Sequence, residues 1–296
     1  MQLFNLIERK EKYQEFIKLI EKSFKYLAPH SYAMDFYPLV NSSNHQNCFM
    51  LLENEELIAT CAFLPRTIVA SSAHQVFFMG AIAVQEKFRH QGLGKKIVSE
   101  SIAKIKEGAW VGLWSDKKSF FSNLGFSDYE EQYFLPIQYL APMQNSIRIE
   151  KFKVSQLSNQ QKMEWKNFYQ NLSNKSITLL RQESDWNNIF NIHSATYVEI
   201  QYQQKKIGYA IVGKGMDLQD VVHEFYVEES FQEACLAKLN QEFSIWLPGA
   251  NYNWDKKFLG PNLMVRPVEK AQWDKWEKDL EKNSMKEFFI SGLDSV

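Results

Sequence analysis

The feature that most constrains this chain is a short basic turn with two glycines, residues 89–95, between a buried strand and an amphipathic helix. Before it, residues 76–84 are apolar enough for a buried strand, and after it apolar residues recur at helical spacing from Leu93 to Ile105. A strand that enters a helix through such a turn points backbone N–H groups and the positive end of the helix dipole at one place. The turn therefore predicts a site for a bulky anion, with a pyrophosphate as its natural occupant.

The residues of the turn support this interpretation. Gly92 and Gly94 let the backbone approach an anion without a Cβ in the way, and Arg89, His90 and Lys95 add positive charge. The turn lacks the Gly-Lys-Ser/Thr ending of a P-loop and does not fit Gly-x-Gly-x-x-Gly. Because an ordinary tight turn has similar residues, a second motif at the right distance along the chain is needed to support an anion site.

Such a motif is present after one helix and one strand. Residues 111–114 predict the next buried strand, and residues 119–126 have the sequence Ser-Phe-Phe-Ser-Asn-Leu-Gly-Phe. Arg89-x-x-Gly92-x-Gly94 resembles the acyl-CoA signature of the GCN5-related N-acetyltransferases (GNAT). Residues 121–126 resemble the aromatic-x-x-x-Gly-Phe segment that closes the core of that family. The resemblance implies an α/β fold with mixed, mostly antiparallel sheets and a splayed central strand pair.

Composition excludes several other classes of protein. The chain has 296 residues, enough for two domains, and its net charge of −1 without a lysine or arginine block argues against a nucleic-acid partner. No apolar stretch approaches the ~20 residues of a membrane span, and the start of the chain has no signal-peptide pattern. The three cysteines are widely spaced, which predicts neither a zinc site nor a disulfide framework. We expect a cytoplasmic protein without a metal.

The first part of the chain predicts the elements of one such domain. A strand at residues 1–7 precedes an amphipathic helix that ends before Pro29, and residues 48–52 and 57–63 predict a hairpin that residues 65–69 extend. Residues 129–137 predict a further strand. The segment 30–47 carries aromatic side chains that either face a substrate or pack the loop down: Tyr32, Phe36 and Tyr37.

The rest of the chain repeats the order helix, hairpin, strand, helix, strand. Its predicted elements are a hairpin at 195–202 and 207–213, a strand at 221–227, a helix at 231–243 and a strand at 244–247. Where the first copy has its glycine turn, this copy has Glu228-Glu229-Ser230, whose carboxylates would repel a pyrophosphate. We therefore predict an acyl-CoA-binding domain, 1–145, and a degenerate GNAT-like domain, 146–296. This layout resembles the enhanced-intracellular-survival type of acetyltransferase.

The resemblance implies acetyl-CoA as cosubstrate. Backbone groups of Ile82, Ala83 and Val84 would bind the pantetheine arm and the thioester. The Arg89 side chain either contacts the anion or braces the loop. The turn residues that would hold the pyrophosphate are Arg89, His90, Gln91, Gly92, Leu93, Gly94 and Lys95.

The catalytic groups are less clearly marked. Many family members place a tyrosine at the first aromatic of the closing segment as the acid for the leaving thiolate, but this chain has Phe121, which has no proton to donate. Ser119 and Ser122 are the nearby substitutes. Asp116 is a candidate base, although its position also suits a helix N-cap. In the tandem type the terminal carboxylate reaches the active site, which makes Val296 a further candidate for the base. Asp294 could act in the same way.

The expected function is acetyl-CoA-dependent N-acetylation by direct attack of an amine on the thioester. The alternative is a catalytically silent CoA-binding sensor or interaction module, and Phe121 is the feature that favours it. The acceptor amine, which is a small molecule or a peptide, and the oligomeric state are left open by the sequence.

Overall fold

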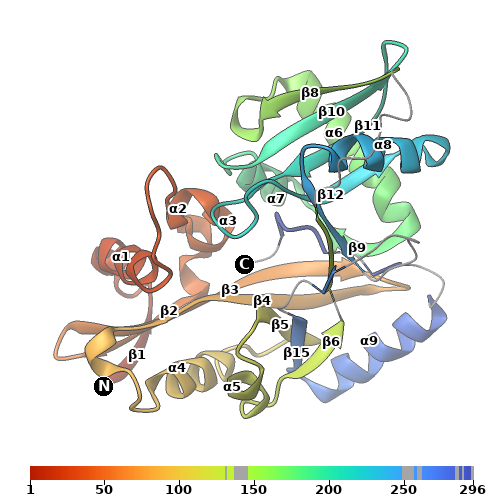
Figure 1. Ribbon diagram of the computed structural model, residues 1–296. Coiled ribbons are helices and arrows are strands. Elements are labelled where there is room, and N and C mark those ends of the chain that lie inside the picture. Colours follow the sequence, from red (N-terminus) through yellow and green to blue (C-terminus); the bar gives the residue numbers. More distant parts are fainter. Residues whose placement is uncertain are drawn as a thin grey trace.

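The computed structural model describes residues 1–130, 132–136, 146–248, 257–258, 262–283, 287–288 and 290–294. The chain forms two mixed β-sheets, the first in the lower part and the second in the upper part of Figure 1. Helices α4 and α5 cover one face of the first sheet, and α1 to α3 with α9 cover the other. Their bounds are α1 (Tyr13–Ser23), α2 (Tyr32–Asp35), α3 (Tyr37–Val40), α4 (Leu93–Ile102), α5 (Lys118–Ser122) and α9 (Lys270–Lys282).

The first sheet has the strand order β1-β2-β3-β4-β5-β15-β6. The strand β9 (Ser176–Leu180) pairs with the far end of β3, and β16 (Glu287–Phe288) pairs with β9. The predicted hairpin is present as β2 and β3, and β3 runs on to Val69 as expected. The strands on the main path are β1 (Gln2–Asn5), β2 (Cys48–Glu53), β3 (Glu56–Val69), β4 (Ala73–Val84), β5 (Trp110–Ser115), β15 (Asn262–Pro267) and β6 (Ser127–Glu130).

The second sheet has the order β14-β7-β13-β12-β11-β10-β8 and is covered by α6 (Asn159–Lys175), α7 (Glu183–Ile189) and α8 (Gln232–Asn240). A capping box between Ser158 and Gln161 starts α6, because each residue satisfies a free backbone N–H of the other. The strands are β8 (Ile147–Lys153), β10 (Thr196–Tyr202), β11 (Lys205–Val212), β12 (Val221–Val227), β13 (Ser244–Pro248), β14 (Lys257–Phe258) and β7 (Gln132–Leu135).

The two sheets exchange strands. β6 ends at Glu130 in the first sheet, and β7 begins at Gln132 in the second sheet, where it pairs with β13. In return, β15 lies between β5 and β6 of the first sheet. The single strand predicted at 129–137 is therefore wrong, since its described residues belong to two strands in different sheets. The predicted domains, 1–145 and 146–296, name segments of the chain and not separate sheets.

A buried ion network joins the two sheets and the end of the chain. Arg181, just after β9, donates from Nη1 to Glu224 Oε1 of β12 (3.1 Å) and from Nη2 to Asp294 Oδ2 (2.7 Å). Arg66 of β3 donates from Nη1 to Asp185 Oδ1 of α7 (2.9 Å), and its Nε lies 3.5 Å from Asp294 Oδ1. The side chains of Arg181, Glu224 and Asp294 are fully buried. This network ties residues 290–294 to both sheets.

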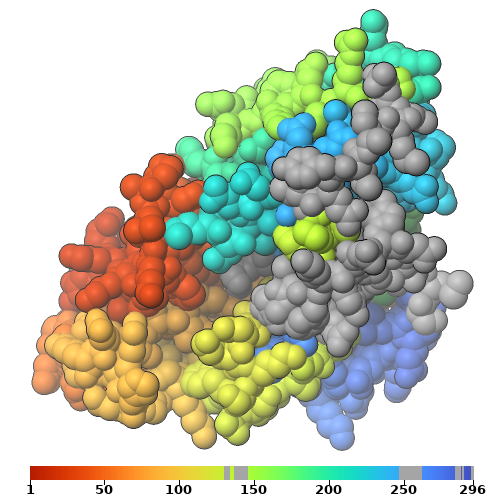
Figure 2. Space-filling view, in the orientation of Figure 1, coloured from red at the N-terminus to blue at the C-terminus, as the bar shows by residue number. Residues whose placement is uncertain are grey.

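Lys214 is buried at the same junction. Its Nζ donates to the Gly292 carbonyl (2.7 Å) and lies 4.5 Å from the centre of the Phe36 ring. The loop that carries Lys214 also meets the first part of the chain at the surface, where the cyan segment touches the red one in Figure 2. Burial lowers the pKa of Lys214 to about 7, although the charge of Asp294 acts in the opposite direction.

This pKa predicts how stability depends on pH. Between about pH 7 and the ordinary lysine pKa of 10.5, the unfolded chain holds a proton on Lys214 that the folded chain has lost. The free energy of unfolding should therefore rise with pH in this window, by at most about 1.4 kcal/mol per pH unit. Urea unfolding from pH 7 to 9 should show this rise for the wild type relative to Lys214→Met. If the free energy of unfolding changes with pH by the same amount in both proteins, the prediction is contradicted.

Candidate active site

The first sheet opens between β4 and β5. These parallel strands pair only where Val76 to Phe78 lie opposite Trp110 to Gly112. β4 continues to Val84 along β3, whereas the rest of β5 pairs with β15 on its far side. Beyond Phe78, β4 therefore presents backbone N–H and C=O groups to the opening instead of to a neighbouring strand.

A bulge bends β4 at this open edge. Ala81 has a φ of +54°, and the pairing register between β3 and β4 shifts between Thr60 and Ala62. The Thr60 hydroxyl donates to the Ala81 carbonyl (2.8 Å) and fixes the bend. A bulge re-aims the backbone groups beyond it. Residues 82–84, which the sequence predicts to bind pantetheine, lie on this bent and open stretch.

Tyr32 lies beside the Ala81 backbone at the bulge, and this backbone acts to lower the pKa of the phenol, against the larger effect of burial. The ring is buried and stacks on Phe36, with 4.6 Å between the ring centres. Burial raises the pKa of Tyr32, so the phenol keeps its proton at neutral pH. The sequence left Tyr32 and Phe36 as either substrate-facing or packing residues. The structure shows both as packing rings in the core, with Tyr32 beside the Ala81 backbone.

The glycine turn lies at the end of this edge and leads into α4. His90 and Gly92 both have left-handed backbone conformations, with φ of +63° and +76°. Among the described residues, no hydrogen-bond acceptor faces the backbone N–H groups of residues 90–95. A Cβ on Gly92 would meet nothing within 4 Å, so the space beside it is open. Free N–H groups at a helix N-terminus, beside open space, suit an anion.

The side chains of the turn divide between bracing and exposure. Arg89 donates from Nε to the Val84 carbonyl (3.2 Å), which is the bracing role that the sequence left open. Gln91 donates a hydrogen bond from Nε2 to the Lys87 carbonyl (3.4 Å). Lys95 is exposed, whereas Leu93, the first residue of α4, is buried. The backbone therefore supplies most of the anion-binding capacity here, and the basic side chains add positive charge around it.

The candidate acids and bases after β5 are exposed. Asp116 pairs with Lys117 (2.9 Å), and this hydrogen bond lowers the pKa of its carboxyl group. It does not cap α5, because the residue before that helix is Lys117, whose N–H donates to Ser115 Oγ (2.9 Å). Ser119 and Ser122 lie on α5, outside the core. A solvated carboxylate with a lowered pKa is a weak base, so the geometry gives Asp116 little support.

Phe121 belongs to the hydrophobic core on the α4 side. Its side chain is 6% exposed, and its ring packs edge-on against Phe120 and Phe126, with ring centres 4.9 and 5.7 Å apart. The Phe121 ring therefore packs α5 against the sheet, and it has no proton to donate to a leaving thiolate.

The end of the chain returns to the junction of the two sheets. Asp294 is held by Arg181 and Arg66, so its carboxylate is a structural counter-ion and not a free base. Val296 lies outside the described residues. Its role as a base stays a prediction.

The second sheet repeats the opening without the anion site. β12 and β13 pair in parallel only where Val221 and Val222 lie opposite Ser244 and Ile245. The turn into α8 carries Glu228 and Glu229, which pair with lysines on the surface. The chain thus builds the splayed strand pair twice, and it places negative charge where the first copy places free N–H groups.

Comparison with known proteins agrees with this architecture. Residues 13–126 match the model of the acetyltransferase (GNAT) family. No curated protein matches the sequence. None of the helices among the described residues has the length and apolar character of a membrane span.

Solved structures match nearly the whole chain at low identity. A GCN5-related N-acetyltransferase from Anabaena variabilis matches with a TM-score of 0.64 and 12% identity, over 89% of this chain and 72% of that one. A probable N-acyltransferase from Enterococcus faecalis gives 0.66 and 15%, over 92% and 73%. Eis1 from Mycobacterium abscessus gives 0.58 and 11%, over 90% and 73%. Residues 13–126 thus match the acetyltransferase (GNAT) family, and the chain as a whole has the fold of the GCN5-related N-acetyltransferases.

Proposed function

We propose that this protein is an acetyl-CoA-dependent N-acetyltransferase that transfers the acetyl group directly to an amine. The observation that carries the proposal is the continuity of the open β4 edge with the free N–H groups of residues 90–95. An edge of unpaired peptide groups fits the amides of a pantetheine arm, and the N–H groups fit its pyrophosphate. Acetyl-CoA supplies an activated acyl group when bound there. The cysteines are free and buried, which agrees with a cytoplasmic location.

The reaction forms a C–N bond and breaks a C–S bond. The amine nitrogen attacks the thioester carbon and loses a proton, and the departing thiolate gains one. The open β4 edge orients the thioester through backbone groups. We assign the proton donor to the Tyr32 hydroxyl at the Ala81 bulge, since Phe121 has no proton to give.

The proposed function is tested with saturating acetyl-CoA and a panel of amines, namely a polyamine, an aminoglycoside, a lysine peptide and a peptide with a free N-terminus. Release of free CoA thiol should depend on one of these amines, and mass spectrometry should find the acetylated product. The alternative, a catalytically silent CoA-binding module, is favoured by the positions of Asp116, Ser119 and Ser122 outside the core. Acetyl-CoA binding without turnover on any amine would support that alternative.

The role of Tyr32 predicts a selective loss of turnover. Tyr32→Phe keeps the ring that stacks on Phe36 but removes the hydroxyl at the bulge. We expect kcat to fall at least tenfold, with acetyl-CoA affinity unchanged. Tyr37→Phe, on the neighbouring helix α3, is the matched control. Equal kinetics for both variants would remove Tyr32 from the mechanism.

The terminal carboxylate is tested by a short truncation. Deleting Ser295 and Val296 leaves Asp294 in its ion pairs with Arg181 and Arg66, so the junction keeps its counter-ion. If the Val296 carboxylate accepts the proton of the amine, turnover should fall far more than acetyl-CoA affinity, as calorimetry would show. Wild-type turnover in the truncated enzyme would leave the base to Asp116 or solvent.

A further inference from the structure

The bend in β4 places an alanine in a backbone conformation that residues with a Cβ rarely adopt. Ala81 has a φ of +54°, and among the described non-glycine residues with a positive φ it alone lies inside a strand, since the others lie in turns and loops. Strained backbone of this kind persists where the surrounding structure enforces it, and it gathers at functional sites. A contact that holds Ala81 therefore helps to shape the opening between β4 and β5.

Thr60, on the neighbouring strand β3, makes such a contact. Its hydroxyl donates to the Ala81 carbonyl (2.8 Å), and the pairing register of the two strands shifts directly after Thr60. Donor and acceptor are both buried, and a buried hydrogen bond is costly to leave unmade. The hydroxyl thus fixes the direction in which the backbone beyond Ala81 points.

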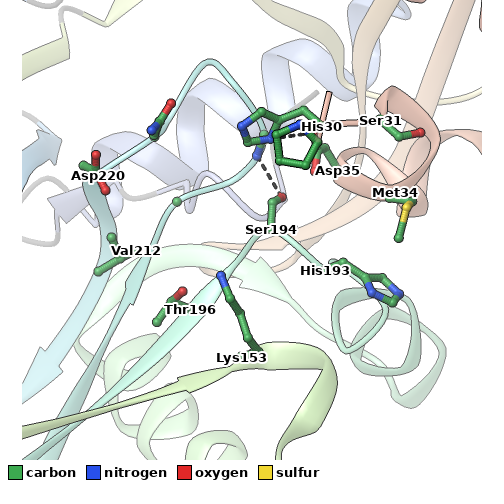
Figure 3. A pocket seen from close by; sticks show the side chains of 14 residues that line it. His30, Ser31, Met34, Asp35, Lys153, His193, Ser194, Thr196, Val212 and Asp220 are labelled. Carbon is green, nitrogen blue, oxygen red and sulfur yellow. Dashed lines mark hydrogen bonds and ion pairs between the residues drawn. The ribbon is translucent and has the colours of Figure 1, made fainter. Parts of the chain in front are cut away.

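Thr60 itself has no access to a ligand. It is 0% exposed, and it does not line the cavity of about 400 Å³ that Figure 3 shows beside α2. The backbone that it holds, in contrast, leads directly into residues 82–84 on the open edge of β4. Any effect of Thr60 on chemistry at this edge therefore passes through the conformation of β4.

The second sheet provides an internal comparison. β12 has an extra residue, His223, where its register with β11 shifts between Ile211 and Val212. Ile211 stands at the register position that Thr60 has in the first sheet, and it has no hydroxyl. The His223 ring instead contacts the Gly213 carbonyl (Nε2 to O, 3.0 Å), and the φ of His223 is not positive. Both copies of the strand carry an extra residue, but the copy with the free N–H groups fixes its bulge with a left-handed residue and a hydroxyl.

We propose that Thr60 is a positioning residue for acetyl transfer, a role that rests on the proposed function. Its hydroxyl holds Ala81 so that a backbone N–H group of residues 82–84 points at the carbonyl oxygen of the bound thioester. That oxygen gains negative charge when the amine attacks, and a donor that is already in place stabilises the charge. Thr60 thereby raises kcat without touching the substrate.

The first test is spectroscopic and needs no amine. The thioester carbonyl band of bound acetyl-CoA, isolated with a carbonyl ¹³C label, should lie at lower infrared frequency in the wild type than in Thr60→Val, because a well-aimed donor weakens the C=O bond. Thr60→Ser keeps the hydroxyl and should show the wild-type band. Thr178→Val makes the same change on β9 of the same sheet, where the hydroxyl meets the Tyr169 hydroxyl, and it should leave the band unchanged. The same band in folded Thr60→Val and wild type, a displaced band in Thr60→Ser, or an equal displacement in Thr178→Val would each overturn the proposal.

The second test is kinetic and uses an amine of the panel that is acetylated. In Thr60→Val kcat should fall at least about tenfold, while the calorimetric affinity for CoA stays within about twofold of the wild type. A loss of CoA affinity as large as the loss of kcat would show that Thr60 only supports the fold, and would overturn the proposal. If Thr60→Val does not fold, Thr60→Ala replaces it in both tests with the same expected results. Absence of acetyl-CoA binding to the wild type would refute the proposed function, whereas binding with the same carbonyl band in both proteins would refute only the role of Thr60.

Discussion

Replacing Gly92 with glutamate is expected to lower the affinity for acetyl-CoA at least tenfold, or about 1.4 kcal/mol. A side chain at a φ of +76° strains the turn, and the added carboxylate would stand beside the free N–H groups of residues 90–95. Because a Cβ on Gly92 meets no neighbouring atom within 4 Å, the variant should still fold. Calorimetric titration with acetyl-CoA measures the loss.

The matched control adds the same charge elsewhere on α4. Ser99 is exposed in the middle of that helix, so Ser99→Glu should bind acetyl-CoA as the wild type does. Circular dichroism would verify that both variants are folded. Unchanged affinity in a folded Gly92→Glu protein would refute the assignment of this turn as the anion site.

The largest expected effect on stability lies at Arg181. Its replacement by methionine leaves Glu224 and Asp294 buried and without their shared cation. Breaking a buried pair on one side typically costs about 3–5 kcal/mol, because an uncompensated charge stays in a low-dielectric interior. Urea unfolding of Arg181→Met should show a loss of that order.

An exposed pair provides the comparison. Lys205 Nζ lies 3.0 Å from Glu228 Oε1, and both side chains are largely solvated. Lys205→Met should therefore cost less than about 1 kcal/mol. Similar losses for Lys205→Met and Arg181→Met would mean that the junction network does not hold the two sheets together.

Local features could be predicted from the sequence because neighbouring residues set them. The glycine turn, the hairpin of β2 and β3, and β12 arise from short-range patterns of apolar and turn-forming residues. The free N–H groups of residues 90–95 arise from the same patterns, since a strand, two glycines and a helix determine them. The ligand of these groups stays a prediction.

Long-range features could not be predicted in the same way. Arg181 and Asp294 are 113 positions apart, and no local pattern marks either as the partner of the other. The sequence predicts a single strand at residues 129–137, yet the strands in the described part of this stretch, β6 and β7, belong to two sheets. The position of Asp116 suits a helix N-cap or a general base, but its exposed carboxylate forms an ion pair with the neighbouring Lys117. Pairings between residues far apart in the chain decided the first two outcomes, and the third follows from a side-chain contact between adjacent residues.

The exchange of strands has a consequence for synthesis on the ribosome. The first sheet needs β15, residues 262–267, to sit between β5 and β6, which are made more than a hundred residues earlier. A nascent chain that ends before residue 262 therefore has a gap in this sheet, and the side of β5 that will pair with β15 is exposed. Such an edge is a template for pairing with other chains. The first sheet should thus be completed late, after nearly the whole chain has left the exit tunnel.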